Sequence, residues 1–248
     1  MSSELKTEKI YPHSKPIDKL NMEDAINLMI DEQKKSIVAL QENKKILNKI
    51  IIKICEKLKS SDIGRLIYTG AGTSGRIAIQ DGIELYPTFG WPKKRLDFIM
   101  SGGKKALFST IENAEDNKGI AKMMAKKMKF NHNDVLIAIS ASGNTPFTVE
   151  VLKVAKFKKS LTIAICNNSN CSMINYSDFC IILDTAEELV AGSTRLKAGT
   201  SQKACINLIS TLVMTKLGKV SDGLMVNMVA TNKKLIKRQK KIKDLIKL

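Results

Sequence analysis

Short apolar segments alternate with longer amphipathic segments through the middle of this 248-residue chain. The apolar segments have the length and composition of buried strands, and the stretches between them show helical periodicity. Such alternation predicts an α/β fold in which a parallel sheet of about five strands carries helices on both faces, because right-handed crossovers place the connecting helices there. The expected strands are 65–69, 95–100, 134–140, 161–166 and 179–183.

Helices are expected between these strands and on either side of them. Between the strands, the helical stretches are 75–85, 104–112, 118–129, 146–157 and a short one at 172–175. A helical segment with one break is expected over 21–58, and a long helix is expected over 198–217. We therefore divide the chain into an N-terminal helical extension (1–60), a core domain (61–220) and a C-terminal helical segment (221–248).

The segment Arg65 to Gly90 places a turn rich in glycine and hydroxyl residues directly after one expected strand and before a helix. Free backbone N–H groups and the helix dipole make such a turn an anion-binding site. Gly72 allows close approach of a ligand, and Thr73 and Ser74 add hydroxyl donors. We therefore expect a phosphate group to bind at this turn.

The same turn also matches the G-x-G-x-x-G pattern of dinucleotide-binding proteins. That pattern requires an acidic residue at the end of the second strand to bind the ribose. The acidic residue of the second expected strand, Asp97, lies near its start instead. Hydroxyl side chains within the turn also suit a terminal phosphate better than a pyrophosphate, so the phosphate interpretation is favoured.

A second loop repeats this arrangement after the third expected strand. It contains Ser140, Ser142, Gly143 and Thr145, and Pro146 is well placed to open the helix that follows. A simpler interpretation is that one hydroxyl caps the helix while the others are solvated. Two such loops at the carboxyl edge of one sheet nevertheless favour a shared phosphate pocket, because ligands of α/β sheets bind at that edge.

These motifs together resemble a known family. S-x-S-G-x-T and G-T-S-G, each after a strand, are similar to the sugar isomerase (SIS) domain, which binds phosphosugars. GAGTSGR, DGIELYPTFGWP, ENAEDN, AGSTRLKAGTSQK and NLISTLVMTKLGKV resemble N-acetylmuramic acid 6-phosphate etherase over about residues 7–234. The resemblance implies a SIS-type fold, a small-molecule sugar phosphate as ligand, a homodimer, and chemistry that requires no cofactor and no metal.

The resemblance also implies a reaction, cleavage of the D-lactyl ether of N-acetylmuramic acid 6-phosphate to N-acetylglucosamine 6-phosphate and D-lactate in cell-wall amino-sugar recycling. An alkyl ether resists direct hydrolysis, so we expect elimination of lactate followed by addition of water. Glu84 and Glu115 fall on two acidic positions implicated in catalysis by this family. On composition alone, Glu84 would be a solvated residue on a helix surface and Glu115 would cap the helix that follows it. We assign Glu84 as the acid and Glu115 as the base, and the sequence leaves the reverse assignment open.

The segment 191–200 concentrates glycine, hydroxyl residues and two cations before the last long helix. Arg195 or Lys197 can bind the lactyl carboxylate, and the guanidinium is the better geometric match. A capped helix start with solvated cations is an equal alternative. The chain departs from the family pattern at Asn144, where arginine is common, and its C-terminal segment is expected to be shorter than usual for the family.

Two other functions would use the same pocket. A sugar-phosphate isomerase would move a proton between C1 and C2 of its substrate and would release no lactate. A non-catalytic regulator that senses sugar phosphate would bind without turnover, and the paired glutamates argue against it. A transcription regulator would need a helix-turn-helix, and residues 1–60 contain nothing resembling a recognition helix.

The charge and hydropathy of the chain argue against nucleic-acid and membrane partners. The formal net charge is +17, but the lysines are dispersed and are not clustered with aromatic residues, so no nucleic-acid partner is expected. No apolar run reaches membrane-spanning length, and the N-terminus lacks the apolar core of a signal peptide. We therefore expect a cytoplasmic protein with no membrane partner. The basic run 233–247 is expected to form a terminal amphipathic helix.

The chain has five cysteines without C-x-x-C spacing: Cys55, Cys166, Cys171, Cys180 and Cys205. They are expected to be reduced, packed thiols in a cytosolic protein. The chain contains two histidines, His13 and His132, so a histidine-based metal site is not expected.

Overall fold

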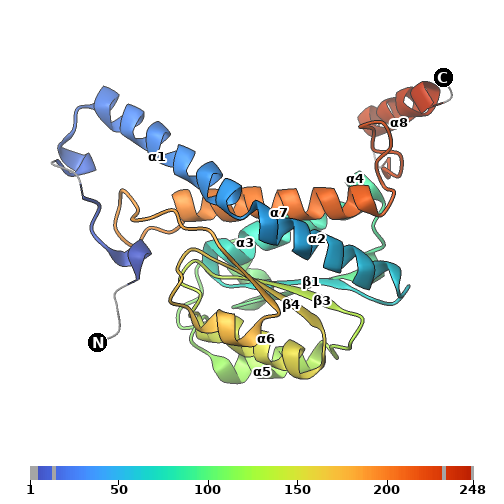
Figure 1. Cartoon of the computed structure of the whole chain (residues 1–248), viewed down its shortest axis with the longest axis horizontal. Coiled ribbons are helices and arrows are strands. Elements are labelled where there is room, and N and C mark those ends of the chain that lie inside the picture. The colour runs from blue at the N-terminus through green and yellow to red at the C-terminus, as the bar shows by residue number, and fades with distance from the viewer. Residues whose placement is uncertain (1–4, 13–14, 231–232, 247–248) are drawn as a thin grey trace.

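The computed structural model describes residues 5–12, 15–230 and 233–246, and its centre is a parallel sheet of five strands in the order β2-β1-β3-β4-β5 (Figure 1). The predicted strands are confirmed to within about a residue at each end. Their bounds are β1 (Leu66–Gly70), β2 (Leu96–Met100), β3 (Val135–Ile139), β4 (Leu161–Cys166) and β5 (Phe179–Ile182).

Helices cover both faces of this sheet (Figure 1). One face packs against α2 (Lys44–Lys59), α3 (Gly72–Ile83) and α7 (Lys197–Lys216), and the other against α5 (Lys118–Lys127) and α6 (Pro146–Phe157). The remaining α-helices are α1 (Met22–Glu42), α4 (Leu85–Phe89) and α8 (Lys233–Ile246). Short 3₁₀ helices span Lys6–Glu8, Ile17–Lys19, Lys93–Arg95, Gly103–Leu107 and Ser172–Tyr176. The α/β fold with helices on both faces is therefore confirmed.

The central strand β3 shows why the sheet forms. All five of its side chains are fully buried. Val135, Ile137 and Ile139 point into the cluster that includes α2 and α7, whereas Leu136 and Ala138 point into the cluster that includes α5 and α6. A strand covered on both faces buries every side chain, so it reads as a continuous apolar run and not as an alternation of apolar and polar residues.

The expected break in the N-terminal helical segment lies at Asn43, between α1 and α2. Its side-chain amide donates to the carbonyl of Ala39 and to that of Ile182, both at 2.8 Å. At the start of α1, the side chain of Asn21 accepts from the Asp24 N–H at 2.9 Å, so Asn21 is the N-cap. The break therefore ties the helical pair to the edge of the sheet.

The helix predicted over 104–112 is wrong. A 3₁₀ helix occupies Gly103–Leu107, and a loop follows it. Gly102 and Gly103 enter this segment at φ of 75° and 66°, which turns the chain sharply after β2. The Arg76 guanidinium then binds the carbonyls of Ala106 and Ser109, at 2.9 and 3.1 Å, and thereby holds the segment against α3 instead of letting it continue as a helix.

The predicted terminal helix is confirmed over Lys233–Ile246, while Lys247 and His13 lie outside the described residues. Within the part of the chain that the structure describes, no helix combines the length and the apolar character needed to cross a bilayer. The division of the chain at residues 60 and 220 remains a prediction.

Candidate active site

The first predicted phosphate loop lies where β1 meets α3. A Cβ atom on Gly75 would lie 2.8 Å from the Gly70 carbonyl oxygen, so glycine is needed for the helix to start this close to the strand end. Gly72 has a φ of 51°, in the left-handed region. The N-cap residue Ala71 has no side-chain hydrogen bond to the first turn of α3, which leaves N–H groups of that turn for a ligand.

The second loop joins β3 to α6, and its hydroxyl groups form a connected cluster. The Ser140 hydroxyl lies 2.8 Å from that of Thr145 and 3.3 Å from that of Ser142. The backbone N–H of Gly143 donates to the Ser140 hydroxyl, and the N–H of Asn144 donates to that of Ser142, both at 3.1 Å. These bonds fix the loop before any ligand arrives, so the hydroxyls are preorganised for an anion.

The two loops face each other across one hollow of about 230 Å³. This arrangement brings together six of the predicted phosphate-binding residues: Gly72, Thr73, Ser74, Ser140, Ser142 and Thr145. Glu115 lines the same hollow. Gly143 lies beneath it, with a φ of 68° at a position where a Cβ would overlap that of Cys171.

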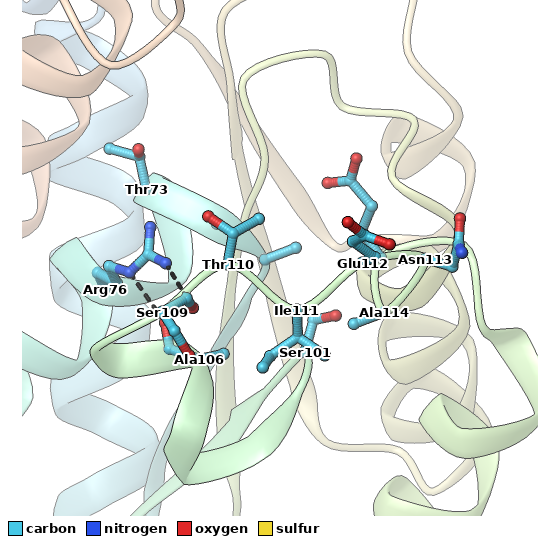
Figure 2. Close-up of a pocket in the computed structure, with 13 residues that line it drawn as sticks. Thr73, Arg76, Ser101, Ala106, Ser109, Thr110, Ile111, Glu112, Asn113 and Ala114 are labelled. Carbon is cyan, nitrogen blue, oxygen red and sulfur yellow. Dashed lines mark hydrogen bonds between the residues drawn. The ribbon is translucent and has the colours of Figure 1, made fainter.

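A second hollow of about 430 Å³ adjoins the first, and both are lined by Gly72, Thr73 and Glu115. Figure 2 shows how the loop after the 3₁₀ helix forms its wall and how the Arg76 side chain reaches this loop. Together the two hollows can accept a phosphate at the glycine-rich turn and a longer polar group beyond Glu115.

The segment that carries Glu115 is anchored to the second loop. The Glu115 carbonyl accepts from the N–H of Phe147, in the first turn of α6, at 2.9 Å. The helix cap that the sequence also allowed for Glu115 belongs to Asn117, whose side chain accepts from the Ile120 N–H at 2.9 Å. The Glu115 side chain is exposed, and Glu115 lines both hollows.

Glu84 lies at the other end of α3. It separates α3 from α4, and its side chain is exposed. Since α3 begins at the phosphate loop and contains 12 residues, Glu84 is about 18 Å along the helix axis from that loop at 1.5 Å per residue. A single chain therefore does not bring Glu84 and Glu115 to one site.

Lys197 is not available to a ligand, contrary to the prediction. It is buried, its ammonium group forms an ion pair with Glu32, and it donates to the carbonyl of Glu187. The ammonium group also lies 5.4 Å from the centre of the Tyr11 ring. Lys197 therefore has a structural role, because a cation removed from water needs an anionic partner nearby.

The start of α7 is capped, as in the alternative interpretation, although Lys197 is buried and not solvated. The Glu188 carboxylate accepts from the N–H groups of Lys197 and Ala198, at 3.1 and 2.9 Å, and burial raises the pKa of this carboxyl group. Arg195 is exposed and lines neither hollow, whereas the adjacent Thr194 lines the smaller one. The predicted role of Arg195 remains untested by this geometry.

Asn144, the residue that departs from the family pattern, fixes the second loop to the segment after β4. Its side-chain oxygen accepts from the backbone N–H and the hydroxyl of Ser172, at 2.7 and 2.6 Å. Its amide donates to the carbonyl of Asn170 at 3.3 Å. Asparagine therefore stabilises the loop through neutral hydrogen bonds at this position.

Sequence reasoning missed Ser101, which lines the larger hollow. It is buried, and its hydroxyl has no hydrogen-bond partner among the described residues. Its backbone N–H donates to the Gly70 carbonyl at 3.1 Å, which sets Ser101 beside the first phosphate loop. The sequence does contain a signal for this residue, because Ser101 directly follows a strand and therefore lies at the ligand-binding edge of the sheet.

The fold and the paired loops define a SIS-type α/β protein. The SIS domain model matches residues 103–212, and the model of the glucokinase regulatory protein N-terminal SIS domain matches residues 47–156. A phosphoheptose isomerase from Francisella tularensis has a similar structure, with a TM-score of 0.53 and 20% identity over 79% of this chain and 100% of that one. The Vibrio vulnificus NanR protein, solved in complex with ManNAc-6P, has a TM-score of 0.52 and 15% identity, over 90% of this chain and 71% of that one.

Relatives found by sequence identify a narrower family within this class. The chain is 41% identical to the N-acetylmuramic acid 6-phosphate etherase of Mycoplasma mycoides subsp. mycoides SC, over 96% of this chain and 78% of the relative. It is 40% identical to the etherase of Clostridium acetobutylicum over the same two shares. The chain belongs to the N-acetylmuramic acid 6-phosphate etherase family.

Proposed function

We propose that this chain is a carbon–oxygen lyase that cleaves the D-lactyl ether of N-acetylmuramic acid 6-phosphate in the cytoplasm. The observation that carries the proposal is the convergence of two hydroxyl-rich anion loops and the Glu115 carboxylate on one hollow. The substrate follows from 41% identity to an etherase over 96% of the chain. The products are N-acetylglucosamine 6-phosphate and D-lactate.

The reaction proceeds by elimination and water addition. In the open-chain aldehyde, the C1 carbonyl acidifies the C2 proton, a base removes that proton, and lactate leaves from C3 with a proton from an acid. Water then adds to the unsaturated aldehyde at C3. General acid–base catalysis of this kind requires one carboxylate and one carboxylic acid at suitable positions.

Glu115 is the base in this proposal, because its carboxylate lies beside the loops that hold the phosphate. Glu84 is the acid, and the distance along α3 requires that it act in the site of a partner subunit. The phosphate binds to the N–H groups and hydroxyls of the two loops, which leaves the sugar ring to extend past Glu115 towards the larger hollow.

The test is incubation of the purified chain with N-acetylmuramic acid 6-phosphate in H₂¹⁸O. We expect release of D-lactate and incorporation of ¹⁸O at C3 of the sugar, because the elimination breaks the bond between C3 and the ether oxygen. Release of lactate that carries ¹⁸O in its hydroxyl would mean cleavage on the lactate side. Turnover of a sugar phosphate without any lactate would instead support an isomerase.

Ser142→Ala is expected to weaken binding of N-acetylglucosamine 6-phosphate by about tenfold or more, because a hydrogen bond to a charged phosphate is lost. The Ser142 hydroxyl lines the hollow and accepts from the Asn144 N–H. Isothermal titration calorimetry measures the change. Ser60→Ala is the matched control, because the exposed Ser60 hydroxyl binds the Lys57 carbonyl at the end of α2. Equal affinity in the two variants would remove Ser142 from the phosphate site.

A homodimer is the expected assembly, since α1, α2 and α7 form an apolar groove that includes Ile37, Leu40, Leu47, Leu208 and Leu212. Leu212 is 44% exposed in the single chain. Leu212→Lys should shift the mass measured by light scattering from dimer to monomer, because a buried ammonium group would lose its hydration. Phe157→Lys is the control, since this side chain on α6 is 81% exposed and lies away from the groove. A monomeric parent chain with full activity would contradict the dimer.

A further inference from the structure

Three of the five cysteines gather beneath the second phosphate loop, although they are spread over 15 positions of the chain. Cys166 ends β4, Cys180 lies on the neighbouring strand β5, and Cys171 lies in the turn between these strands. The Cys166 sulfur lies 3.4 Å from that of Cys171 and 3.7 Å from that of Cys180. All three sulfurs lie within 4.8 Å of one another.

The three thiols differ in their exposure to solvent. Cys166 and Cys171 are buried, and Cys180 is partly exposed, so the cluster is open to solvent through Cys180. The Cys166 sulfur lies within hydrogen-bonding distance of the sulfurs of Cys171 and Cys180, and either atom of each pair can be the donor.

We propose that Cys166, Cys171 and Cys180 form a binding site for one soft, thiophilic metal ion, with Cu⁺ as the ion that the ligand set fits best. Thiolate ligands select soft cations. A structural Zn²⁺ site requires four ligands, and among the described residues no histidine, aspartate or glutamate joins the three sulfurs. A set of three sulfurs with no fourth protein ligand therefore favours an ion of low coordination number.

Binding requires no oxidant or reductant. Cu⁺ binds the three sulfurs as thiolates, and each thiol that is protonated before binding releases its proton to solvent. The affinity for Cu⁺ should consequently increase with pH, because protons compete with the metal for the thiolate ligands.

The position of the cluster links it to the phosphate loop. Gly143 packs against Cys171 so closely that a Cβ would overlap it, and the Met173 N–H donates to the Gly143 carbonyl at 3.1 Å. Ser172 donates two hydrogen bonds to the side chain of Asn144, which belongs to the same loop as Gly143. A metal bound to Cys171 would therefore stiffen the turn that supports the loop. The functional meaning of this link rests on the proposed sugar-phosphate site, whereas the metal site itself does not.

The test is titration of the reduced full-length chain with Cu⁺ buffered by bicinchoninate, a coloured Cu⁺ chelator. We expect one Cu⁺ per chain, and X-ray absorption should show a first shell of sulfur alone. Cys171→Ser and Cys180→Ser should each weaken Cu⁺ binding by at least about tenfold. Cys55→Ser should bind Cu⁺ like the parent, because Cys55 lies apart from the cluster and its thiol donates to the Val213 carbonyl at 3.9 Å.

Equal Cu⁺ binding by the parent and by Cys171→Ser would overturn the proposal, as would loss of Cu⁺ to an equimolar amount of Zn²⁺. If Cys171→Ser does not fold, Cys180→Ser decides the question, because Cys180 is partly exposed and tolerates a polar replacement. The readout is metal binding, so its failure is distinct from a failure to release D-lactate.

Discussion

Glu115→Gln is expected to lower the kcat for D-lactate release by ~10²–10⁴, the usual contribution of a general acid–base group. The amide keeps the shape of the side chain but cannot remove the C2 proton. The affinity for N-acetylglucosamine 6-phosphate should change little, because in the proposed site the phosphate contacts come from the two loops that line the smaller hollow. The same variant should also lose exchange of the C2 proton with solvent deuterium, which mass spectrometry of the sugar product detects.

Glu112→Gln is the matched control for this variant. Glu112 is exposed, lies three residues before Glu115 and lines the larger hollow but not the hollow between the phosphate loops. We expect Glu112→Gln to retain kcat within about tenfold of the parent. If the two variants lose activity equally, or if Glu115→Gln loses only binding, the carboxylate of Glu115 contributes charge or contacts and does not transfer the proton.

Glu84→Gln should lower kcat to a similar degree, and the geometry adds a sharper expectation. Within one chain, α3 separates Glu84 from the loop that shares a hollow with Glu115, so an active site that needs both glutamates must take them from two subunits. A dimer of one Glu84→Gln chain and one Glu115→Gln chain then has one site with both changes and one site with neither. Refolding an equal mixture of the two inactive variants should restore roughly a quarter of the parent activity, because half of the dimers are mixed and each mixed dimer has one intact site.

Each variant refolded alone is the control for this complementation, and both should stay inactive. A mixture as inactive as its components would place the two glutamates in the same subunit's site or remove Glu84 from catalysis. Full activity of Glu84→Gln alone would show that Glu84 takes no part in catalysis. The measurement is D-lactate release at matched total protein concentration, with the dimer fraction determined by light scattering.

Most of the fold could be predicted from the sequence, because its determinants are local. A buried parallel strand is an apolar run, and the helix after it has a 3.6-residue period, so the five strands and their order along the chain are visible in the sequence. The helix predicted over 104–112 was wrong because long-range contacts decided it. Arg76, on a different helix, binds the carbonyls of Ala106 and Ser109.

The positions of the two hydroxyl-rich loops were predictable for the same reason as the strands. A strand end, a turn of glycine and hydroxyl residues and a helix N-terminus are contiguous in sequence, and ligands of parallel sheets bind at one known edge. That is why Thr73, Ser74, Ser140, Ser142 and Thr145 lie around one hollow as expected.

Tertiary structure decided what the polar and sulfur side chains outside these loops contact. Lys197 belongs to a sequence segment typical of a binding loop, yet the fold buries it against Glu32, a residue of α1 that is 165 positions away. The cysteines lack any metal-binding spacing, yet the pairing of β4 with β5 and the turn between them bring three sulfurs together. By itself, the sequence determined the sheet, most of its helices and the positions of the two hydroxyl-rich loops, because local periodicity and contiguous motifs encode them. The partner of a buried charge and the neighbours of a thiol depend on contacts between distant segments, so only the folded chain determined them.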